Sequence, residues 1–190
     1  MDNLKKEWKG ILSASVFLIV LCLVVTLAVS ASNSATEDRI AMQQERARAQ
    51  AMHSLLPAYR YEWGFGDDII FSGPSVYRAL AQDGEVLGHI FISSAFGWGG
   101  SVQVMTAIQD GQVLSIAILD AAGETPGLGQ NILRESFTDQ FRGISGAPEL
   151  VRGATSEANQ IQALTGATVS AKAVVDAVAD AMEIYEAFVR

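Results

Sequence analysis

Hydrophobic residues follow three different patterns along this chain. Residues 11–31 form an apolar run without a charged residue. Residues 76–119 contain short runs in which apolar and polar positions alternate, and residues 171–188 carry apolar side chains at spacings of three and four. In order, these patterns predict a transmembrane helix, then strands, then an amphipathic helix. Strands followed by a helix indicate an α+β domain after the membrane segment.

The apolar run is expected to be a transmembrane helix over residues 10–31, because a helix of this length spans the roughly 30 Å of a bilayer core. The short segment before it, residues 1–9, contains three lysines, namely Lys5, Lys6 and Lys9. Acidic residues Glu37 and Asp38 follow the run. The positive-inside rule therefore places residues 1–9 in the cytoplasm. Everything after the helix is expected on the periplasmic or extracellular side of the cell (inner) membrane, with membrane lipid around the helix itself.

A cleaved signal peptide is the alternative interpretation of the apolar run. Ala28, Val29 and Ser30 precede Ala31, and small residues of this kind suit a signal peptidase. The apolar core of a cleaved peptide is usually about 7–15 residues long, however, and this run is longer. A retained single-pass anchor is therefore favoured.

Residues 32–57 are expected to form a helical stalk. Ser34 and Glu37 have the spacing of a capping box, which predicts a helix start just after the membrane. Residues 38–56 are rich in Ala, Gln, Glu and Arg, and contain no Gly or Pro before Pro57. A separate domain, residues 58–190, is expected to follow.

Asp-Gly pairs occur twice between the alternating segments. Asp83-Gly84 separates residues 76–82 from 85–92, and Asp110-Gly111 separates residues 102–109 from 112–119. Both pairs predict β-hairpins with type I′ turns. Apolar positions of the second hairpin alternate with polar or smaller ones, which predicts one buried face of an antiparallel sheet. These positions are Val102, Val104, Ile108, Leu114, Ile116 and Ile118.

Glycine-rich segments precede and follow the second hairpin. Phe96-Gly97-Trp98-Gly99-Gly100 leads into it, and Gly123-Glu124-Thr125-Pro126-Gly127-Leu128-Gly129 comes after it. Glycine permits positive φ and close backbone approach, so these segments could hold a flat ligand or could be tight turns only. A helix is expected directly afterwards, over residues 130–141.

The last predicted element is an amphipathic helix that follows a Thr-Gly-Ala-Thr sequence. Its expected buried positions are Val174, Val178, Ala181, Tyr185 and Phe188. Thr168 or Ser170 is expected to be the N-cap. Small residues before the cap leave the first-turn N–H groups open to an anion such as phosphate.

Composition narrows the possible chemistry. The net charge of −8 disfavours nucleic acid as a partner. The single cysteine, Cys22, lies in the apolar run, so the domain has no thiolate cluster for zinc or iron–sulfur. Two histidines, His53 and His89, lie too far apart to suggest a metal site. No metal site is expected from these residues.

Two motifs resemble those of a known family. Thr165-Gly166-Ala167-Thr168 before a helix resembles the covalent flavin attachment motif of the FMN-binding domain. Glu124-Thr125-Pro126-Gly127-Leu128-Gly129 resembles the signature of the G subunit of Rnf electron transport complexes. The two motifs occur in the order that the family requires.

The resemblance covers nearly the whole chain. Residues 96–100 resemble the family's Gly-aromatic-Gly-Gly strand start, and the anchor with Asp38-Arg39-Ile40 resembles its N-terminal part. Two positions depart from the family pattern. Gln162 stands where that pattern has an acidic residue, and Ala122 stands where many members have histidine.

This resemblance implies an electron-carrying subunit of a membrane-bound, ion-translocating ferredoxin:NAD oxidoreductase (Rnf) complex. FMN would be attached to Thr168 through a phosphoester by a flavin transferase, and the other membrane subunits of the complex would be partners. The remaining residues expected to bind the flavin are Thr165, Gly166, Ala167, Glu124, Thr125, Gly127, Leu128, Gly129 and Trp98. Two alternatives stay open: the FMN-carrying C subunit of a sodium-pumping NADH:quinone reductase, and a non-redox, membrane-anchored binding or assembly module.

Overall fold

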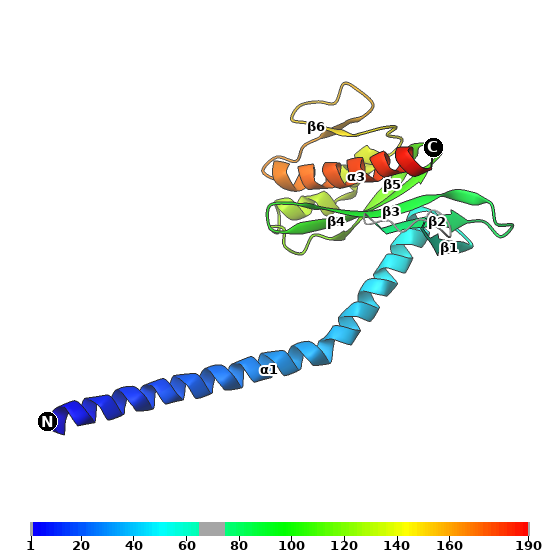
Figure 1. The fold of residues 1–190 in the computed structure, drawn as a ribbon. Helices are drawn as coiled ribbons and strands as arrows, with labels where there is room; N and C mark the ends of the chain where they lie inside the picture. Colours follow the sequence, from blue (N-terminus) through cyan, green and yellow to red (C-terminus); the bar gives the residue numbers. More distant parts are fainter. Residues whose placement is uncertain (1, 65–74, 190) are drawn as a thin grey trace. The chain divides into compact units, whose positions relative to one another are not determined.

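The computed structural model describes residues 2–64 and 75–189. The chain divides into two compact units, Met1–Arg46 and Ala47–Arg190. The first helix, α1 (Asp2–Leu55), contributes residues to both units (Figure 1). All other helices and strands of the described residues belong to the second unit.

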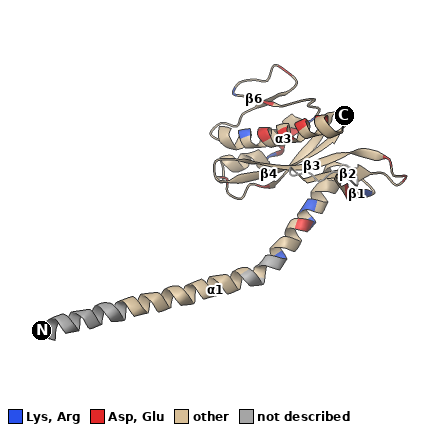
Figure 2. Cartoon of the chain, viewed as in Figure 1, with Lys and Arg blue, Asp and Glu red and all other residues tan. Residues whose placement is uncertain are grey.

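The first unit consists of the N-terminal part of α1. Within it, Ser15–Asn33 is long and apolar enough to cross a membrane, with a mean hydropathy of 2.6. None of this segment is buried inside the protein, and Phe17, for example, is 70% exposed. Figure 2 shows no charged residue on this stretch, and charged residues on the part of α1 that follows. A single helix with an exposed apolar surface suits contact with lipid, which agrees with the predicted anchor.

The helix does not restart at Ser34, so the predicted capping box is wrong. α1 continues through this position without a break. The Thr36 hydroxyl donates to the carbonyl oxygens of Ser32 (3.0 Å) and Asn33 (3.1 Å), as threonine does inside a helix. Since no Gly or Pro occurs in residues 11–56, nothing interrupts the helix between the apolar segment and the stalk.

The second unit is built on a five-stranded antiparallel sheet with strand order β1-β2-β3-β4-β5. The strands are β1 (Arg60–Trp63), β2 (Ser75–Leu80), β3 (Val86–Phe96), β4 (Ser101–Gln109) and β5 (Gln112–Asp120). Each strand pairs with its neighbour in the sequence, so the sheet is a meander. With the helices that follow, it confirms the α+β prediction.

The segment after the sheet contains short turns, a small parallel ladder and one long helix. These elements are η1 (Gly129–Leu133), α2 (Glu135–Thr138), η2 (Asp139–Phe141), β6 (Glu149–Val151), β7 (Gln160–Gln162) and α3 (Thr168–Phe188). β6 and β7 pair in parallel. α3 lies along one face of the sheet, against β3 and β4 (Figure 1).

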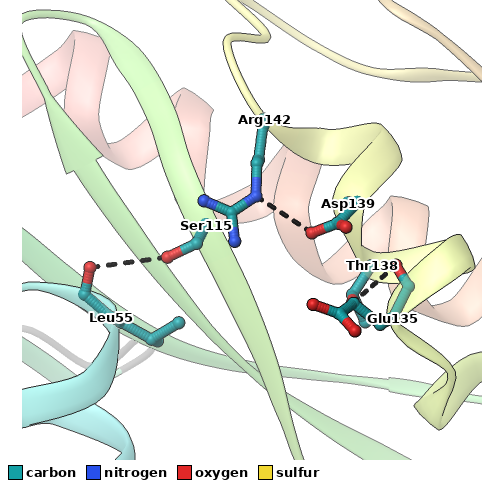
Figure 3. Close-up of polar contacts among 6 residues, drawn as sticks. All are labelled: Leu55, Ser115, Glu135, Thr138, Asp139 and Arg142. Atoms are coloured by element: carbon teal, nitrogen blue, oxygen red, sulfur yellow. Dashed lines mark hydrogen bonds and ion pairs between the residues drawn. The ribbon is translucent and has the colours of Figure 1, made fainter.

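Both faces of the sheet are buried, which is more than the single buried face expected from the alternation. On the α3 side, the main core includes Phe91, Val104, Ile108, Val174 and Val178. On the other side, a second core includes Met52, Leu56, Ile90, Met105 and Ala107. Because successive strand residues point to opposite faces, Met105 and Ala107 of β4 face away from α3 and belong to the same core as Met52 of α1. There the Ser115 hydroxyl donates to the carbonyl oxygen of Leu55 (3.4 Å; Figure 3).

The turn of the second hairpin is type I′, as predicted. Asp110 and Gly111 have φ values of 52° and 78°, between the paired residues Gln109 and Gln112. Positive φ at both central residues is the mark of this turn.

The turn of the first hairpin is not type I′, which corrects the prediction. Gly84 has a φ of 88°, whereas Asp83 does not have a positive φ. The Asp83 carboxylate accepts a hydrogen bond from the Glu85 N–H (3.1 Å), and the Ala81 N–H donates to the Glu85 carbonyl oxygen (2.8 Å). This local side-chain bond stabilises a longer loop with a single left-handed glycine.

The apolar residues of β5 do not all share one face. The register shifts between Ala107 and Ile108, so that Leu114 opposes neither of them. Ile116 lies in the main core, whereas Leu114 packs against the second core. A bulge of this kind inserts one residue and reverses the facing of the strand beyond it. The simple alternation predicted for Leu114 was therefore wrong.

The helix predicted over residues 130–141 is divided into three short turns, η1, α2 and η2. Arg134, between η1 and α2, is extended, with φ −73° and ψ 138°. Ile132, Phe137 and Phe141 are all fully buried. In one continuous α-helix, positions 132 and 137 would point about 140° apart. The break at Arg134 allows all three side chains to enter the core, and burial outweighs the lost helical hydrogen bonds.

Two polar contacts in and next to these turns are short-range. The Thr138 hydroxyl donates to the Glu135 carbonyl oxygen (3.3 Å), and Arg142 Nε pairs with Asp139 Oδ1 at 2.9 Å (Figure 3). The ion pair is exposed on both sides, so it contributes only about 0–1 kcal/mol. Packing of the buried aromatic rings therefore determines where the turns break.

Candidate functional site

A cleft of about 340 Å³ lies where three segments of the second unit meet. The segments are the turn between β3 and β4, the glycine-rich loop after β5, and the turn that leads into α3. Its lining residues are Trp98, Glu124, Thr125, Leu128, Gly129, Gly166, Ala167, Thr168, Val169 and Ser170. Both sequence motifs therefore contribute to one cleft, although they are far apart in the chain.

Two of the residues expected to bind the flavin do not line this cleft. Thr165 is exposed and borders a second hollow of about 440 Å³, which shares Gly166 and Thr168 with the cleft. Gly127 has a φ of 77°, and its carbonyl oxygen accepts a hydrogen bond from Asn131 Nδ2 (2.9 Å). Gly127 therefore shapes the loop, and it does not form a wall of the cleft.

α3 begins at Thr168, and Ala167 is its N-cap, with φ −138° and ψ 36°. No side chain caps this helix, so the prediction of Thr168 or Ser170 as the cap was wrong. Gly166, with a φ of 78°, turns the chain so that Thr168 enters the helix as its first residue. The Thr168 hydroxyl has no hydrogen-bond partner among the residues that the structure describes, and it borders the cleft.

The backbone at the start of α3 is open to an anion. The first helical hydrogen bond runs from the Ala171 N–H to the Ala167 carbonyl oxygen (2.9 Å). Backbone N–H groups before Ala171 have no partner within the helix, and the helix dipole places partial positive charge there. This end of α3 is therefore suited to a phosphate group beside Thr168.

Glu124 joins the three segments of the cleft. Its side chain is only 2% exposed. Its Oε1 accepts a hydrogen bond from the Gly99 N–H (3.2 Å), and its Oε2 accepts one from the Ser170 hydroxyl (2.6 Å). The sequence indicated Glu124, but these two partners were missed. One signal for Ser170 was available, because it precedes Val174 by four residues and so shares the buried face of α3.

Glycines allow the close approach of these segments. A side chain on Gly99 would overlap the backbone carbonyl oxygen of Gly123, and one on Gly129 would overlap the Glu124 carboxylate. Neither glycine has a positive φ, so backbone conformation does not require glycine at these two positions. They are needed because the backbones and the buried carboxylate leave no room for a Cβ atom.

Apolar side chains stand exposed around the cleft. Trp98 is 76% exposed and Leu128 is 49% exposed. Large apolar side chains beside a few polar groups are typical of small-molecule sites. A flat ligand could therefore lie against apolar walls while Thr125 offers a hydroxyl.

A positively charged side chain lies near Thr168 in the second hollow. Arg152 lines that hollow together with Thr165 and Thr168, whereas the lining of the cleft includes no Lys or Arg. Lys172, one turn into α3, is paired with Asp176 at 2.5 Å. Arg152 is therefore the cation that adjoins Thr168 in these two hollows.

The histidines lie away from the cleft. His89 packs under α3 against Tyr185, with ring centroids 5.9 Å apart. Burial, with a further contribution from Arg78, lowers the pKa of His89, so the ring favours its neutral form. His53 is exposed near the end of α1. Neither residue lines the cleft.

Two sequence families match different parts of the chain. The FMN-binding domain matches residues 97–183, which include every residue that lines the cleft. The RnfG N-terminal region matches residues 1–55, which correspond closely to α1.

G subunits of ion-translocating oxidoreductase complexes are similar to this chain over most of their length. The G subunit of the Na⁺-translocating ferredoxin:NAD⁺ oxidoreductase complex of Acetobacterium woodii is 29% identical over 201 residues, which cover 97% of this chain and 96% of the relative. The G subunit of the ion-translocating oxidoreductase complex of Escherichia coli strain K12 is 30% identical over 162 residues, which cover 78% of each chain.

The structure of Shewanella oneidensis NqrC shows a similar fold, with a TM-score of 0.53 and 17% identity, over 60% of this chain and 58% of that protein. This likeness concerns the fold alone, whereas the relatives match in sequence. The chain therefore belongs to the family of ion-translocating oxidoreductase complex G subunits, with that family's RnfG N-terminal region and FMN-binding domain.

Proposed function

We propose that this chain is the electron-carrying subunit of an ion-translocating ferredoxin:NAD oxidoreductase (Rnf) complex, with FMN bound covalently to Thr168. The observation that carries the proposal is the position of Thr168, which is both the first residue of α3 and part of the wall of the cleft. The flavin ring supplies the electron chemistry, and the protein holds it, orients it and tunes it.

The cleft suits the ring of a flavin. Its volume of about 340 Å³ falls within the range of roughly 300–1,000 Å³ that is common for small-molecule sites. Trp98 and Leu128 would provide apolar walls, and Thr125 would provide a hydroxyl for a polar edge of the ring. The glycine backbones at Gly129 and Gly166 would let the ring approach closely.

The surroundings of Thr168 suit a phosphoester. A flavin transferase would take the flavin phosphate from a flavin dinucleotide: the Thr168 hydroxyl oxygen would form the new P–O bond, the pyrophosphate bond of the donor would break, the nucleoside monophosphate would leave, and the hydroxyl proton would pass to a base of the transferase or to water. The open N–H groups of the first turn of α3 and the guanidinium of Arg152 would offset the negative charge of the phosphate. The Ser170 hydroxyl, in contrast, is already bonded to Glu124. Thr168 is therefore the better acceptor of the two.

Electron transfer requires partners on both sides of the flavin. The ring would accept electrons from one redox group and pass the same number to another, and we propose that both groups belong to other membrane subunits of the complex.

A covalent link suits the proposed extracytoplasmic location of the domain, because no pool of free FMN exists there from which the domain could refill its site. The apolar part of α1, in contact with lipid, would anchor the domain to the membrane.

The proposal is tested by the mass and the colour of the purified full-length chain. When the chain is produced together with a flavin transferase, we expect one FMN adduct in the intact mass and a yellow colour that persists after acid precipitation. A colourless chain of unmodified mass, made beside a transferase that modifies a reference substrate, would contradict the proposal. It would favour the non-redox binding or assembly module.

The proposed orientation of the chain in the membrane leads to a separate prediction. Protease added outside spheroplasts should degrade the domain after the apolar helix, whereas an N-terminal tag should survive. The reason is the positive charge of Lys5, Lys6 and Lys9 before the helix. Immunoblots for the tag and for the C-terminal domain would show the result. Loss of the tag together with protection of the domain would show that the orientation is the opposite of the one proposed.

A further inference from the structure

We propose that Glu124 sets the redox potential of the flavin in the cleft. Its buried carboxylate places a negative charge without a cationic partner on the cleft wall, and this charge lowers the midpoint potential of the ring. This inference rests on the proposed function, because it requires a flavin at this site. The covalent attachment of FMN does not by itself set the midpoint potential of the flavin.

The carboxylate is bonded to neutral donors only. They are the Gly99 N–H and the Ser170 hydroxyl, at 3.2 Å and 2.6 Å. Other acids among the described residues, such as Glu62, Asp139 and Asp176, do form ion pairs. The lining of the cleft includes no Lys, Arg or His. Within the part of the chain that the structure describes, no cationic side chain pairs with Glu124, and the charge beside it is the partial positive charge at the start of α3.

The charge of Glu124 is not needed to hold the segments together. Burial of a carboxylate without a cationic partner disfavours folding, because water solvates the charge better than two neutral donors do. A glutamine at position 124 would have nearly the same shape, and its carbonyl oxygen could accept a hydrogen bond. The negative charge therefore opposes stability at a place that borders the cleft, which points to a role in function.

The carboxylate is held in a fixed position. Side chains on Gly97 and Gly129 would both overlap its oxygens, so the backbone encloses it on two sides. At 2% exposure it is also poorly screened by water. A fixed charge in such surroundings acts on a nearby group far more strongly than an exposed one does.

The direction of the effect follows from Coulomb's law. Electrons that enter the ring add negative charge to the cleft, and the Glu124 carboxylate repels that charge. Reduction becomes less favourable, and the midpoint potential falls. The electrons come from one redox group and leave to another, so Glu124 itself is neither oxidised nor reduced.

The test compares two substitutions that remove one negative charge each, in the full-length, flavin-loaded chain. Glu124→Gln should shift the midpoint potential to a more positive value in a spectroelectrochemical titration. The matched control is Asp120→Asn, because Asp120 is exposed and lies at the end of β5, just before the same loop. Its carboxylate accepts a hydrogen bond from the Ala122 N–H (2.9 Å), which asparagine can preserve. The control should keep the potential of the unsubstituted chain, because water and salt screen an exposed charge.

A second measurement uses chain without flavin. The urea midpoint of Glu124→Gln should be equal to or higher than that of the unsubstituted chain, since an uncompensated buried charge has been removed. A Glu124→Gln chain that fails to fold, or that unfolds at clearly lower urea, would overturn the inference by making the charge a structural requirement.

The potentials provide the other decisive outcomes. An unchanged potential in flavin-loaded Glu124→Gln would overturn the inference, as would an equal shift in Asp120→Asn. Neither result would affect the proposed attachment of FMN. Absence of flavin from the unsubstituted chain would instead contradict the proposed function itself.

Discussion

Replacement of Thr168 with valine is expected to abolish covalent flavin attachment while the domain stays folded. Valine has nearly the shape of threonine but has no oxygen that could form the phosphoester. Thr168 makes no capping hydrogen bond, because the N-cap of α3 is Ala167. We therefore expect the free energy of unfolding to stay within about 0.5 kcal/mol of the unsubstituted chain.

The matched control is Thr165→Val. Thr165 belongs to the same motif but is exposed, and it borders the second hollow and not the cleft. It should keep the covalent flavin. Each variant would be made with a flavin transferase, denatured, and examined for in-gel fluorescence and for a modified tryptic peptide. Fluorescence that persists in Thr168→Val would identify another hydroxyl as the acceptor.

Gly99→Ala is expected to damage the cleft and the fold together. The added methyl group would overlap the backbone carbonyl oxygen of Gly123, and a backbone atom cannot move aside as a flexible side chain can. The turn that carries Trp98 must therefore shift away from the loop that carries Glu124. Overpacking of this kind typically costs about 1–3 kcal/mol, and we expect a loss of that size together with a lower yield of flavin-loaded chain.

Gly153→Ala is the control for this prediction. A Cβ atom on Gly153 would have no heavy atom within 4 Å beyond the neighbouring residues of the chain, and the φ of Gly153 is not in the left-handed region. Urea unfolding of both variants would measure the stability, and in-gel fluorescence would measure flavin loading. Equal stability and equal loading of Gly99→Ala and Gly153→Ala would show that the contact between the two loops is unimportant.

The turn type of a hairpin was predictable from its Asp-Gly pair only where no side-chain hydrogen bond competed with that turn. Asp110-Gly111 forms the type I′ turn that its sequence indicates, because both residues adopt positive φ. Asp83-Gly84 has the same sequence but forms a longer loop, since the Asp83 carboxylate accepts the Glu85 N–H. The two hairpins were both correct as hairpins, and only the turn type of the first was wrong.

Buried residues decided the shape of the segment over residues 130–141. Its composition allows a helix, but Ile132, Phe137 and Phe141 cannot all face the core from one regular helix. In α3, by contrast, Val174, Val178, Ala181 and Tyr185 are buried as their spacing predicts. The last expected position, Phe188, is 47% exposed, because it lies at the end of the helix.

The sequence by itself determined the elements whose signals are local: the apolar span, the two hairpins, the amphipathic helix and the two motifs around Glu124 and Thr168. Periodicity and turn residues act over a few neighbours, so they can be recognised without the fold. Only the tertiary structure decided which residues meet. Glu124 is 25 residues from Gly99 and 46 residues from Ser170 in the chain, and no local pattern connects them. Their contact exists because α3 packs across the sheet and brings its first turn against the loop after β5, which is also why one cleft contains both motifs.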